Sequence, residues 1–280
     1  MLPPEKLKFF ANYIEKELGI IYSESNYFQL ENRLAELSGL LNLGGVEQVW
    51  EKAQTGIQGY LKQALLDIST NNETSFFRDP KVFTTLEKGV IPQWVQQKKR
   101  LIRIWSAASS YGQEPYSMAM LMDEAQKINP TLTWEILATD IAEKVLTKAS
   151  EGKYTQFEVQ RGLCAKRLVK YFQKTPEHFW MIRPEVKAKV KFQKQNLLGA
   201  FDKIGKFDLI LCRNVLIYQK PEAKSKIVAR LSECLNPGGY LIMGAGESLI
   251  GISDRFNLVN FGDAIFYQLK PVTEKGARAA

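Results

Sequence analysis

Hydrophobic side chains recur at helical spacing through the first 70 residues. Residues 4–18 repeat large apolar positions every three or four residues, and Gly19 can end that helix. The same period predicts three more helices, over residues 27–41, 46–53 and 57–68. Short amphipathic helices must bury their apolar faces against one another. We therefore expect an N-terminal helical domain over residues 1–75.

After residue 100 the pattern changes to short apolar runs that alternate with helical stretches. The runs predict strands over residues 101–105, 134–140, 190–196 and 207–212, with helices over 114–127, 141–150 and 222–235. Residues 236–239 (NPGG) stop the last helix, and residues 240–245 and 264–270 are expected to pair as a closing antiparallel hairpin. This alternation predicts an α/β fold with a doubly wound, mainly parallel sheet. Ligands of such sheets bind beyond the carboxyl ends of the strands.

Residues 151–189 interrupt the alternation. They are too long for an ordinary connection of about 2–6 residues, and they are basic and aromatic. We interpret them as an inserted subdomain, partly helical and partly a small sheet, within a main domain of residues 76–270. The last ten residues, 271–280, are expected to be disordered.

Composition excludes several classes of protein. The 280 residues are 45% hydrophobic and 24% charged, as in globular domains. No apolar run approaches the ~20 residues that span a bilayer, and the N-terminus lacks the apolar core of a secretory signal. We expect a cytoplasmic protein without membrane insertion. Cys164, Cys212 and Cys234 are far apart and His178 is the only histidine, so we expect reduced thiols and no metal site.

The net charge of +8 is unevenly distributed. Residues 1–70 contain six Lys or Arg and nine Asp or Glu, whereas residues 151–195 contain eleven basic and four acidic residues. A positive charge by itself would suit nucleic acid, a membrane surface or an acidic protein. The distribution places much of the basic excess in and beside the insertion and leaves the helical bundle acidic.

Two candidate ligand positions follow the first two strands of the sheet. Residues 106–113 (SAASSYGQ) lack a GxGxxG pattern, but Ala108 and Gly112 are small, and a helix that begins near Glu114 offers free amide groups. The segment is therefore either part of a site for a nucleotide-like ligand or a plain strand–helix turn. Asp140 ends the second strand, where a carboxylate either accepts bonds from ribose hydroxyls or caps the next helix. Both roles lead us to expect an exposed carboxylate.

Two further segments carry polar side chains next to predicted strands or domain boundaries. Residues 71–80 (NNETSFFRDP) surround two phenylalanines with amides, a hydroxyl, an acid and Arg78. This segment is either a linker whose aromatic rings fill an interdomain core, with Arg78 in a salt bridge, or a lid over a charged ligand. Arg213 and Asn214 follow a buried-looking strand on the ligand side of the sheet, and Tyr218 lies a little further on.

In combination these segments resemble the CheR-type methyltransferases, which methylate glutamates of chemotaxis receptors. The resemblance runs in order from about residue 5 to 270 and rests on residues 72–79 (NETSFFRD), 105–120, 138–154, 196–198, 207–218 (FDLILCRNVLIY) and 235–249. EPYS at 114–117 and CRNVLIY at 212–218 are its most specific motifs. It implies a class I S-adenosylmethionine (AdoMet) fold and a protein-glutamate O-methyltransferase that releases S-adenosylhomocysteine (AdoHcy).

The resemblance also assigns cofactor-binding positions. They are Asn72, Thr74, Arg78, Glu114, Asp140, Asn196, Leu197, Arg213 and Asn214. Tyr111 and Gln113 depart from the family's tighter turn. The implied chemistry needs no general base, because a glutamate with a pKa near ~4.3 is already a carboxylate at neutral pH. Arg78 is the candidate catalytic residue, and it positions either the incoming carboxylate or the methionine carboxylate of AdoMet.

The implied partner is the cytoplasmic domain of a methyl-accepting chemoreceptor, not nucleic acid, and we expect a monomer. In the family, basic residues of the N-terminal domain help select the receptor, whereas here the second helix has only Arg33. We therefore expect contact through basic residues of the insertion (Lys166, Arg167, Lys170 and Lys174), or else a solvated basic face. Some family members bind a receptor C-terminal peptide through a glycine-containing loop. Residues 172–184 contain no glycine, which favours a peptide-independent enzyme.

Two alternatives stay open at the level of sequence. A methyltransferase of the same fold could act on another protein or on a small molecule. A non-catalytic AdoMet-binding module could instead serve signalling by interaction alone.

Overall fold

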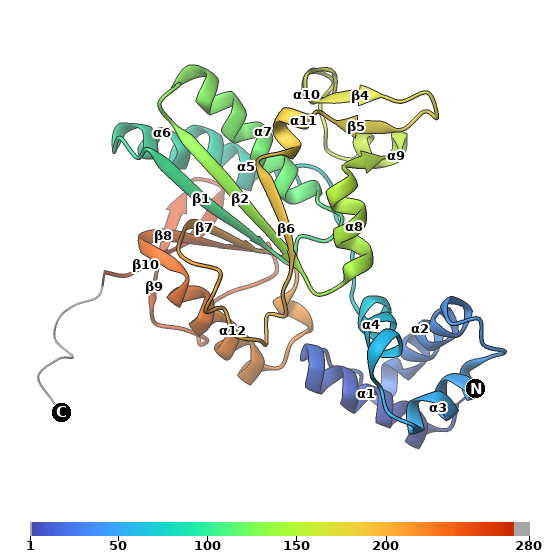
Figure 1. Ribbon diagram of the computed structural model, residues 1–280. Helices are drawn as coiled ribbons and strands as arrows, with labels where there is room; N and C mark the ends of the chain where they lie inside the picture. The colour runs from blue at the N-terminus through green and yellow to red at the C-terminus, as the bar shows by residue number, and fades with distance from the viewer. Residues whose placement is uncertain (1, 272–280) are drawn as a thin grey trace, which may run out of the picture.

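The computed structural model describes residues 2–271, so the tail expected to be disordered lies outside the described residues from residue 272 on. The N-terminal part is a helical bundle, as predicted (Figure 1). Its elements are α1 (Pro4–Leu18), η1 (Glu24–Asn26), α2 (Tyr27–Leu40), α3 (Val46–Gln54) and α4 (Gly59–Ser69). The core is made by fully buried apolar residues such as Phe10, Ile14 and Leu34. Gly19 ends α1 in the left-handed region, which glycine adopts without steric cost.

The main domain is built on a seven-stranded sheet, and the predicted α/β class is confirmed. Its strands are β1 (Leu101–Ala107), β2 (Thr133–Asp140), β6 (Val190–Lys194), β7 (Phe207–Cys212), β8 (Leu235–Met243), β9 (Phe256–Phe261) and β10 (Ala264–Leu269). Their order is β6-β2-β1-β7-β8-β10-β9. The first five in this order are parallel, and β10 runs antiparallel to both of its neighbours.

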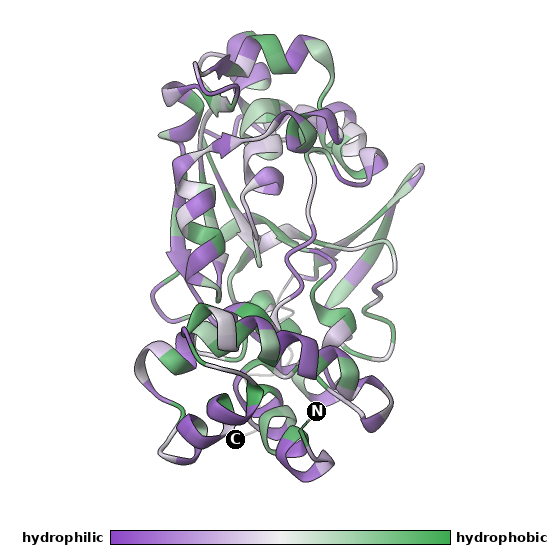
Figure 2. Cartoon of the chain, turned by 90° about the vertical axis from the view of Figure 1, so that its right-hand side faces the viewer, coloured by the Kyte–Doolittle hydropathy of each residue, from purple (hydrophilic) through white to green (hydrophobic). Residues whose placement is uncertain are grey.

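Helices cover both faces of this sheet because its central strands are buried on both sides. Every residue of β7 is buried, with Leu209 and Leu211 packed in one core and Ile210 and Cys212 in the other. One face is covered by α5 (Pro80–Thr85), η2 (Leu86–Val90), α6 (Ile91–Gln96) and α7 (Gln113–Ile128), and α12 (Pro221–Glu233) covers the other. Helix α8 (Glu143–Glu151) packs beside β6. Figure 2 shows hydrophobic and hydrophilic residues interspersed along the helices of the N-terminal bundle.

The sequence prediction of a closing hairpin is only partly right. β8 does pair antiparallel with β10, with Leu241 opposite Tyr267. The hairpin itself is formed by β9 and β10, and β9 was not predicted. β9 is an edge strand whose Leu258 is half exposed, so it lacks the continuous apolar run of the buried strands.

The insertion contains short helices and a small sheet, as predicted. Its elements are β3 (Lys153–Tyr154), α9 (Gln156–Gln160), α10 (Ala165–Tyr171), β4 (Phe172–Lys174), β5 (Trp180–Ile182) and α11 (Pro184–Lys187), and the strands pair in the order β3-β5-β4. A capping box between Thr155 and Glu158 begins α9. The domain boundaries at residues 75, 151 and 189 remain predictions. Among residues 2–271, no helix combines the length and apolar character needed to cross a bilayer.

Candidate functional site

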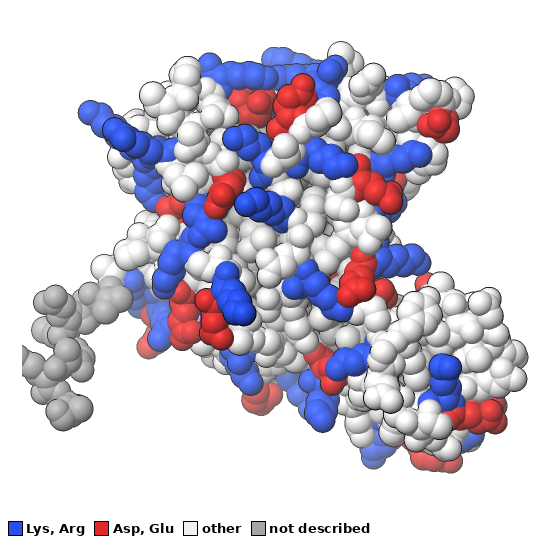
Figure 3. All heavy atoms as spheres, viewed as in Figure 1, with Lys and Arg blue, Asp and Glu red and all other residues white. Residues whose placement is uncertain are grey.

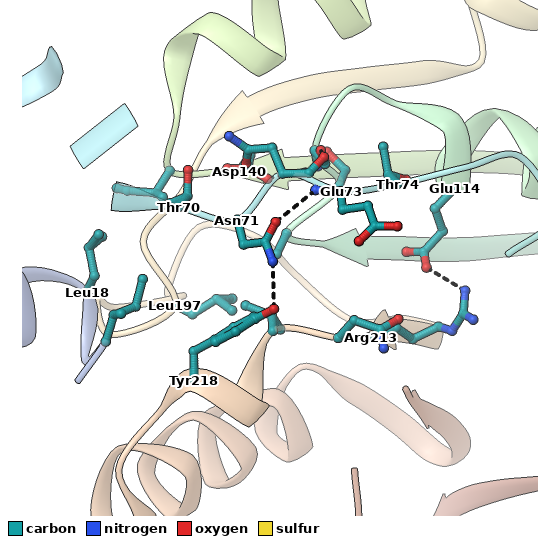
Figure 4. Close-up of a pocket in the computed structure, with 18 of the residues that line it drawn as sticks. Leu18, Thr70, Asn71, Glu73, Thr74, Glu114, Asp140, Leu197, Arg213 and Tyr218 are labelled. Atoms are coloured by element: carbon teal, nitrogen blue, oxygen red, sulfur yellow. Dashed lines mark hydrogen bonds and ion pairs between the residues drawn. The ribbon is translucent and has the colours of Figure 1, made fainter. Parts of the chain in front are cut away.

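A pocket lies beyond the carboxyl ends of β1, β2 and β7. The strand order reverses between β1 and β7, and this switch point is where doubly wound sheets bind ligands. All nine cofactor-binding positions predicted from sequence line this one pocket: Asn72, Thr74, Arg78, Glu114, Asp140, Asn196, Leu197, Arg213 and Asn214. Figure 4 shows Asn71 bonded to Tyr218, and Glu114 to Arg213, around the cavity.

The turn after β1 is held in an uncommon backbone conformation. Ala108 and Ser110 have φ values of 61° and 50°, a region that costs free energy for residues other than glycine. Hydrogen bonds fix the turn to its neighbours. The Ser110 amide donates to Asp140 Oδ2 at 2.8 Å, and Ser110 Oγ donates to the Asn72 carbonyl at 2.7 Å. The turn thus joins the end of β2 to the loop that precedes α5.

Asp140 is buried, so the expectation of an exposed carboxylate is wrong. Its Oδ1 accepts a hydrogen bond from the Ala142 amide at 3.0 Å, at the start of α8, while Oδ2 holds Ser110. Burial raises the pKa of Asp140, and the backbone N–H donors oppose that effect. Each carboxylate oxygen can accept more than one bond, so the side chain can hold the turn and also bind a ligand hydroxyl.

The loop before α5 combines a buried aromatic side and a polar side. Phe76 and Phe77 are buried, and the Phe77 amide donates to Ser117 Oγ at 2.9 Å on α7. On the polar side, Asn71 Nδ2 donates to Tyr218 Oη at 2.7 Å, and Arg78 Nη1 donates to the Glu73 carbonyl at 2.9 Å. The rings thus pack in the core of the main domain while the polar groups line the pocket, and a lid over a charged ligand remains a prediction.

Arg213 is the centre of a buried ionic network. Its side chain is 1% exposed; Nη1 donates to Glu114 Oε2 at 2.9 Å, and Nη2 donates to Asp79 and to the Arg78 carbonyl. Glu114 in turn accepts a bond from Ser106 Oγ at 2.7 Å. Because its terminal nitrogens are bound to protein, Arg213 mainly fixes β1, α7 and the loop before α5 in one arrangement.

Glu247 holds the loop that carries Arg213 and Asn214. Its two carboxylate oxygens accept five backbone hydrogen bonds, from the amides of residues 214, 215, 216, 217 and 244. Gly244 makes this possible, since a Cβ there would lie 2.8 Å from Glu247 Oε2 and 2.7 Å from Asn214 Nδ2. Asn214 itself has a positive φ of 58°. The segment 235–249 contributes to the family resemblance, but no role was predicted for Glu247.

The N-terminal bundle forms one wall of the pocket. Leu18 and Ile20 line it together with Leu197, and sequence reasoning missed the first two. Asn196 Nδ2 donates to the Glu17 carbonyl at 2.8 Å, and its Oδ1 accepts from the Leu198 amide at 2.9 Å. The Asn196 side chain thus ties the loop after β6 to the end of α1.

The pocket has the features of a site for a polar ligand with an apolar part. Within residues 2–271, three lining residues keep buried polar atoms without a protein partner: Ser109 Oγ, Arg213 Nε and Gln219 Oε1. Buried polar atoms in native proteins are normally hydrogen-bonded, so a bound ligand would satisfy them. The wall of Leu18, Ile20 and Leu197 can cover an apolar ring. The residues present therefore fit a nucleoside-like molecule such as AdoMet.

The basic residues of the insertion are not all available to a partner. Arg167 is bonded to Glu124 at 2.8 Å, and its guanidinium lies over the Phe77 ring. Lys170 lies 3.5 Å from the same carboxylate. Figure 3 accordingly shows acidic side chains among the basic ones near the top of the molecule. Of the four residues expected to contact a partner, Lys166 and Lys174 are exposed. Arg167 and Lys170 instead pair with Glu124 and stabilise the packing of α10 on α7.

Comparisons with known proteins agree on one family. The SAM-binding domain that defines CheR methyltransferases matches residues 72–265. The chemotaxis protein methyltransferase of Vibrio anguillarum is 39% identical over 268 residues, which cover 95% of this chain and 97% of that protein. The chemotaxis protein methyltransferase Cher2 of Pseudomonas putida is 36% identical over 265 residues, which cover 93% of this chain and 96% of that protein. The chemotaxis protein methyltransferase of Listeria monocytogenes is 34% identical over 249 residues, which cover 88% of this chain and 91% of that protein.

Proposed function

We propose a function from one premise: the chain belongs to the CheR family of AdoMet-dependent methyltransferases. It is an enzyme that uses AdoMet and serves chemotaxis. We propose that its acceptor is a glutamate side chain on a cytoplasmic helix of a methyl-accepting chemoreceptor, and that the products are a glutamate methyl ester and AdoHcy. The observation that carries the proposal is the convergence of the nine predicted residues on one pocket at the switch point of the sheet.

In this proposal, different pocket residues contact different parts of the cofactor. Asp140 accepts hydrogen bonds from the ribose hydroxyls, and the wall of Leu18, Ile20 and Leu197 covers the adenine. Asn72, Thr74 and Ser109 contribute polar atoms from the two loops that face each other. Glu114, fixed by Ser106 and Arg213, places negative charge where the amino group of the methionine part can bind.

AdoMet held by these residues would supply an electrophilic methyl group to the acceptor oxygen, and the electron pair of the broken C–S bond would stay on the sulfur of AdoHcy. No proton moves, because the acceptor glutamate is already ionised at neutral pH. The protein's contribution is therefore to place the acceptor oxygen in line with the methyl group, and positioning of this kind can supply up to ~7–11 kcal/mol of the barrier. Arg78 and Tyr218 are the pocket residues suited to this task, since both offer donors to a carboxylate and lie at the same pocket.

Incubation with labelled AdoMet and purified chemoreceptor cytoplasmic domains tests the proposal. We expect label on glutamate that alkali releases, because methyl esters hydrolyse in alkali whereas N-methyl groups do not. Asp140→Ala, in which the proposed ribose contact is lost, should abolish label transfer at the same AdoMet concentration. Alkali-stable label would point to another acceptor, and tight AdoHcy binding without transfer to any receptor would favour a binding module.

We also propose that this enzyme acts without a receptor C-terminal peptide. The loop between β4 and β5 spans residues 175–179, contains no glycine, and is closed by a hydrogen bond of 2.8 Å from the Thr175 amide to the Phe179 carbonyl. Calorimetry with a peptide from the receptor C-terminus should show no heat of binding. Micromolar binding would contradict the inference.

A further inference from the structure

A carboxylate of the protein itself lies next to two arginines at the pocket. Glu73 belongs to the loop that lines the pocket, and its Oε1 accepts a hydrogen bond of 2.7 Å from Arg161 Nη2 (Figure 4 labels Glu73). Its backbone carbonyl accepts a bond from Arg78 Nη1 at 2.9 Å. Arg161 follows α9 of the inserted subdomain. The contact therefore joins the subdomain to the loop that holds the cofactor-binding positions.

The Glu73–Arg161 pair is easy to break. The two side chains are 57% and 48% exposed, and exposed ion pairs contribute little because water competes for both partners. Both guanidiniums nevertheless act on this carboxylate: the hydrogen bond from Arg161, and then the charge of Arg78, lower the pKa of Glu73. The surroundings of Glu73 thus favour an ionised carboxylate at this place without binding this particular one strongly.

The backbone beneath the pair is rigid by contrast. Gly162 packs so closely on the loop that a Cβ there would lie 1.8 Å from the Phe76 carbonyl oxygen. Phe76 is fully buried and packs edge-on against Tyr154 and Phe172, with ring centroids 5.0 and 5.5 Å away. The subdomain is therefore fixed on the loop through its core. The guanidinium of Arg161 and the carboxylate of Glu73, by contrast, can exchange partners.

We propose that Arg161 receives the carboxylate of the acceptor and that Glu73 is an internal stand-in which competes with it. This inference rests on the proposed glutamate acceptor. An acidic side chain that enters the pocket can replace Glu73 on Arg161 at little cost, because one exposed ion pair is exchanged for another. Arg161 thereby favours acceptors that bear a carboxylate, while the charge of Glu73 weakens their binding.

The test is a comparison of four variants with purified receptor cytoplasmic domain as acceptor. Arg161→Gln should raise KM for the acceptor about two- to fivefold, since it removes one exposed ion pair with the acceptor carboxylate. Glu73→Gln should lower the same KM about two- to fivefold, because it removes the competing charge. Arg161→Lys should fall between wild type and Arg161→Gln, since it keeps the charge and loses the planar fork. Arg183→Gln removes a charge from the same subdomain and should change KM less than twofold.

Shifts of KM in opposite directions for Arg161→Gln and Glu73→Gln are the decisive result. If the pair were only a clamp on the loop, both variants would break it and both would impair the enzyme, with a matching loss of AdoHcy affinity by calorimetry. A shift of KM in the same direction for both variants would overturn the inference. An unchanged KM for Arg161→Gln with AdoHcy affinity retained would overturn it as well. Wild-type enzyme that transfers no label to glutamate would overturn the proposed function, and this inference with it. Transfer by wild type without the opposite shifts would overturn the inference alone.

Discussion

Replacing Glu247 with glutamine should disrupt the loop that carries Arg213 and Asn214. The carboxylate accepts bonds of 3.1, 2.7 and 3.1 Å on Oε1 and of 2.8 and 2.7 Å on Oε2, all from backbone amides. An amide of the same shape offers one oxygen, and its NH2 group must face backbone N–H groups that are donors themselves. At least two of the five bonds are therefore lost in either orientation.

The size of the effect follows from these two bonds. A hydrogen bond to a charged group contributes about 1.5–3 kcal/mol, and the half-buried position of Glu247 calls for the lower end of that range. We expect a loss of about 3 kcal/mol in the free energy of unfolding, which corresponds to a fall in Tm of roughly 6–12 °C for a protein of this size. AdoHcy affinity should fall as well, since the loop lines the pocket.

Thermal unfolding and calorimetric AdoHcy titration measure both effects. Glu233→Gln is a matched control, because that acid is 66% exposed and lies 3.8 Å from its Arg255 partner. It should change the free energy of unfolding by no more than about 0.5 kcal/mol. A Tm of Glu247→Gln within 2 °C of the control, together with unchanged AdoHcy affinity, would show that these bonds do not hold the loop.

Three further predictions follow from the ionisable groups. AdoHcy affinity should weaken as the pH is lowered toward the pKa of Asp140, which burial raises, because protonation removes the negative charge that strengthens hydrogen bonds from the ribose hydroxyls. Asp140→Asn should bind weakly without this pH dependence, and a parallel pH curve for both proteins would contradict the prediction. Arg213→Met should lower the free energy of unfolding by about 3–5 kcal/mol, since it leaves Asp79 and Glu114 without a counter-charge, and adding Glu114→Gln should restore part of the loss in a denaturant titration. Arg167→Glu should destabilise the protein in the same assay because it faces Glu124, whereas Lys166→Glu should not; equal effects would show that the internal pairing is unimportant.

The parts of the site that could be predicted are those fixed by the sheet. Asp140, Arg213 and Asn214 follow apolar strands directly, and parallel strands bring their carboxyl ends to one edge. No such rule applies to Asn72, Thr74 and Arg78: the polar composition of residues 71–80 allowed a lid over a charged ligand, but only the family resemblance assigned these residues to the cofactor. Their place in the pocket depends on the packing of Phe76 and Phe77, which local periodicity does not encode.

The parts that could not be predicted depend on contacts between distant segments. Leu18 and Ile20 look like ordinary bundle residues, yet they reach the pocket because the end of α1 is tied to the loop after β6. Glu247 looks like a surface acid in a glycine-rich loop, since its partners are backbone amides and carry no sequence signal. The pairing of Arg167 with Glu124 likewise spans 43 positions, so charge counting alone placed Arg167 on a face open to a partner or to solvent.

The charges of the N-terminal bundle bear on how the proposed acidic acceptor would be selected. The bundle is net acidic, and Arg33, the one basic residue of α2, donates to the carbonyls of Ile68 and Thr70. Its guanidinium therefore holds the chain that enters the pocket-lining loop, so these donors are engaged within the protein. An acceptor helix rich in carboxylates gains no electrostatic attraction from this bundle. In the proposed function, the charges that can favour such a helix are the exposed lysines of the insertion and Arg161 beside the pocket, and we propose that they, and not the bundle, contact the acceptor.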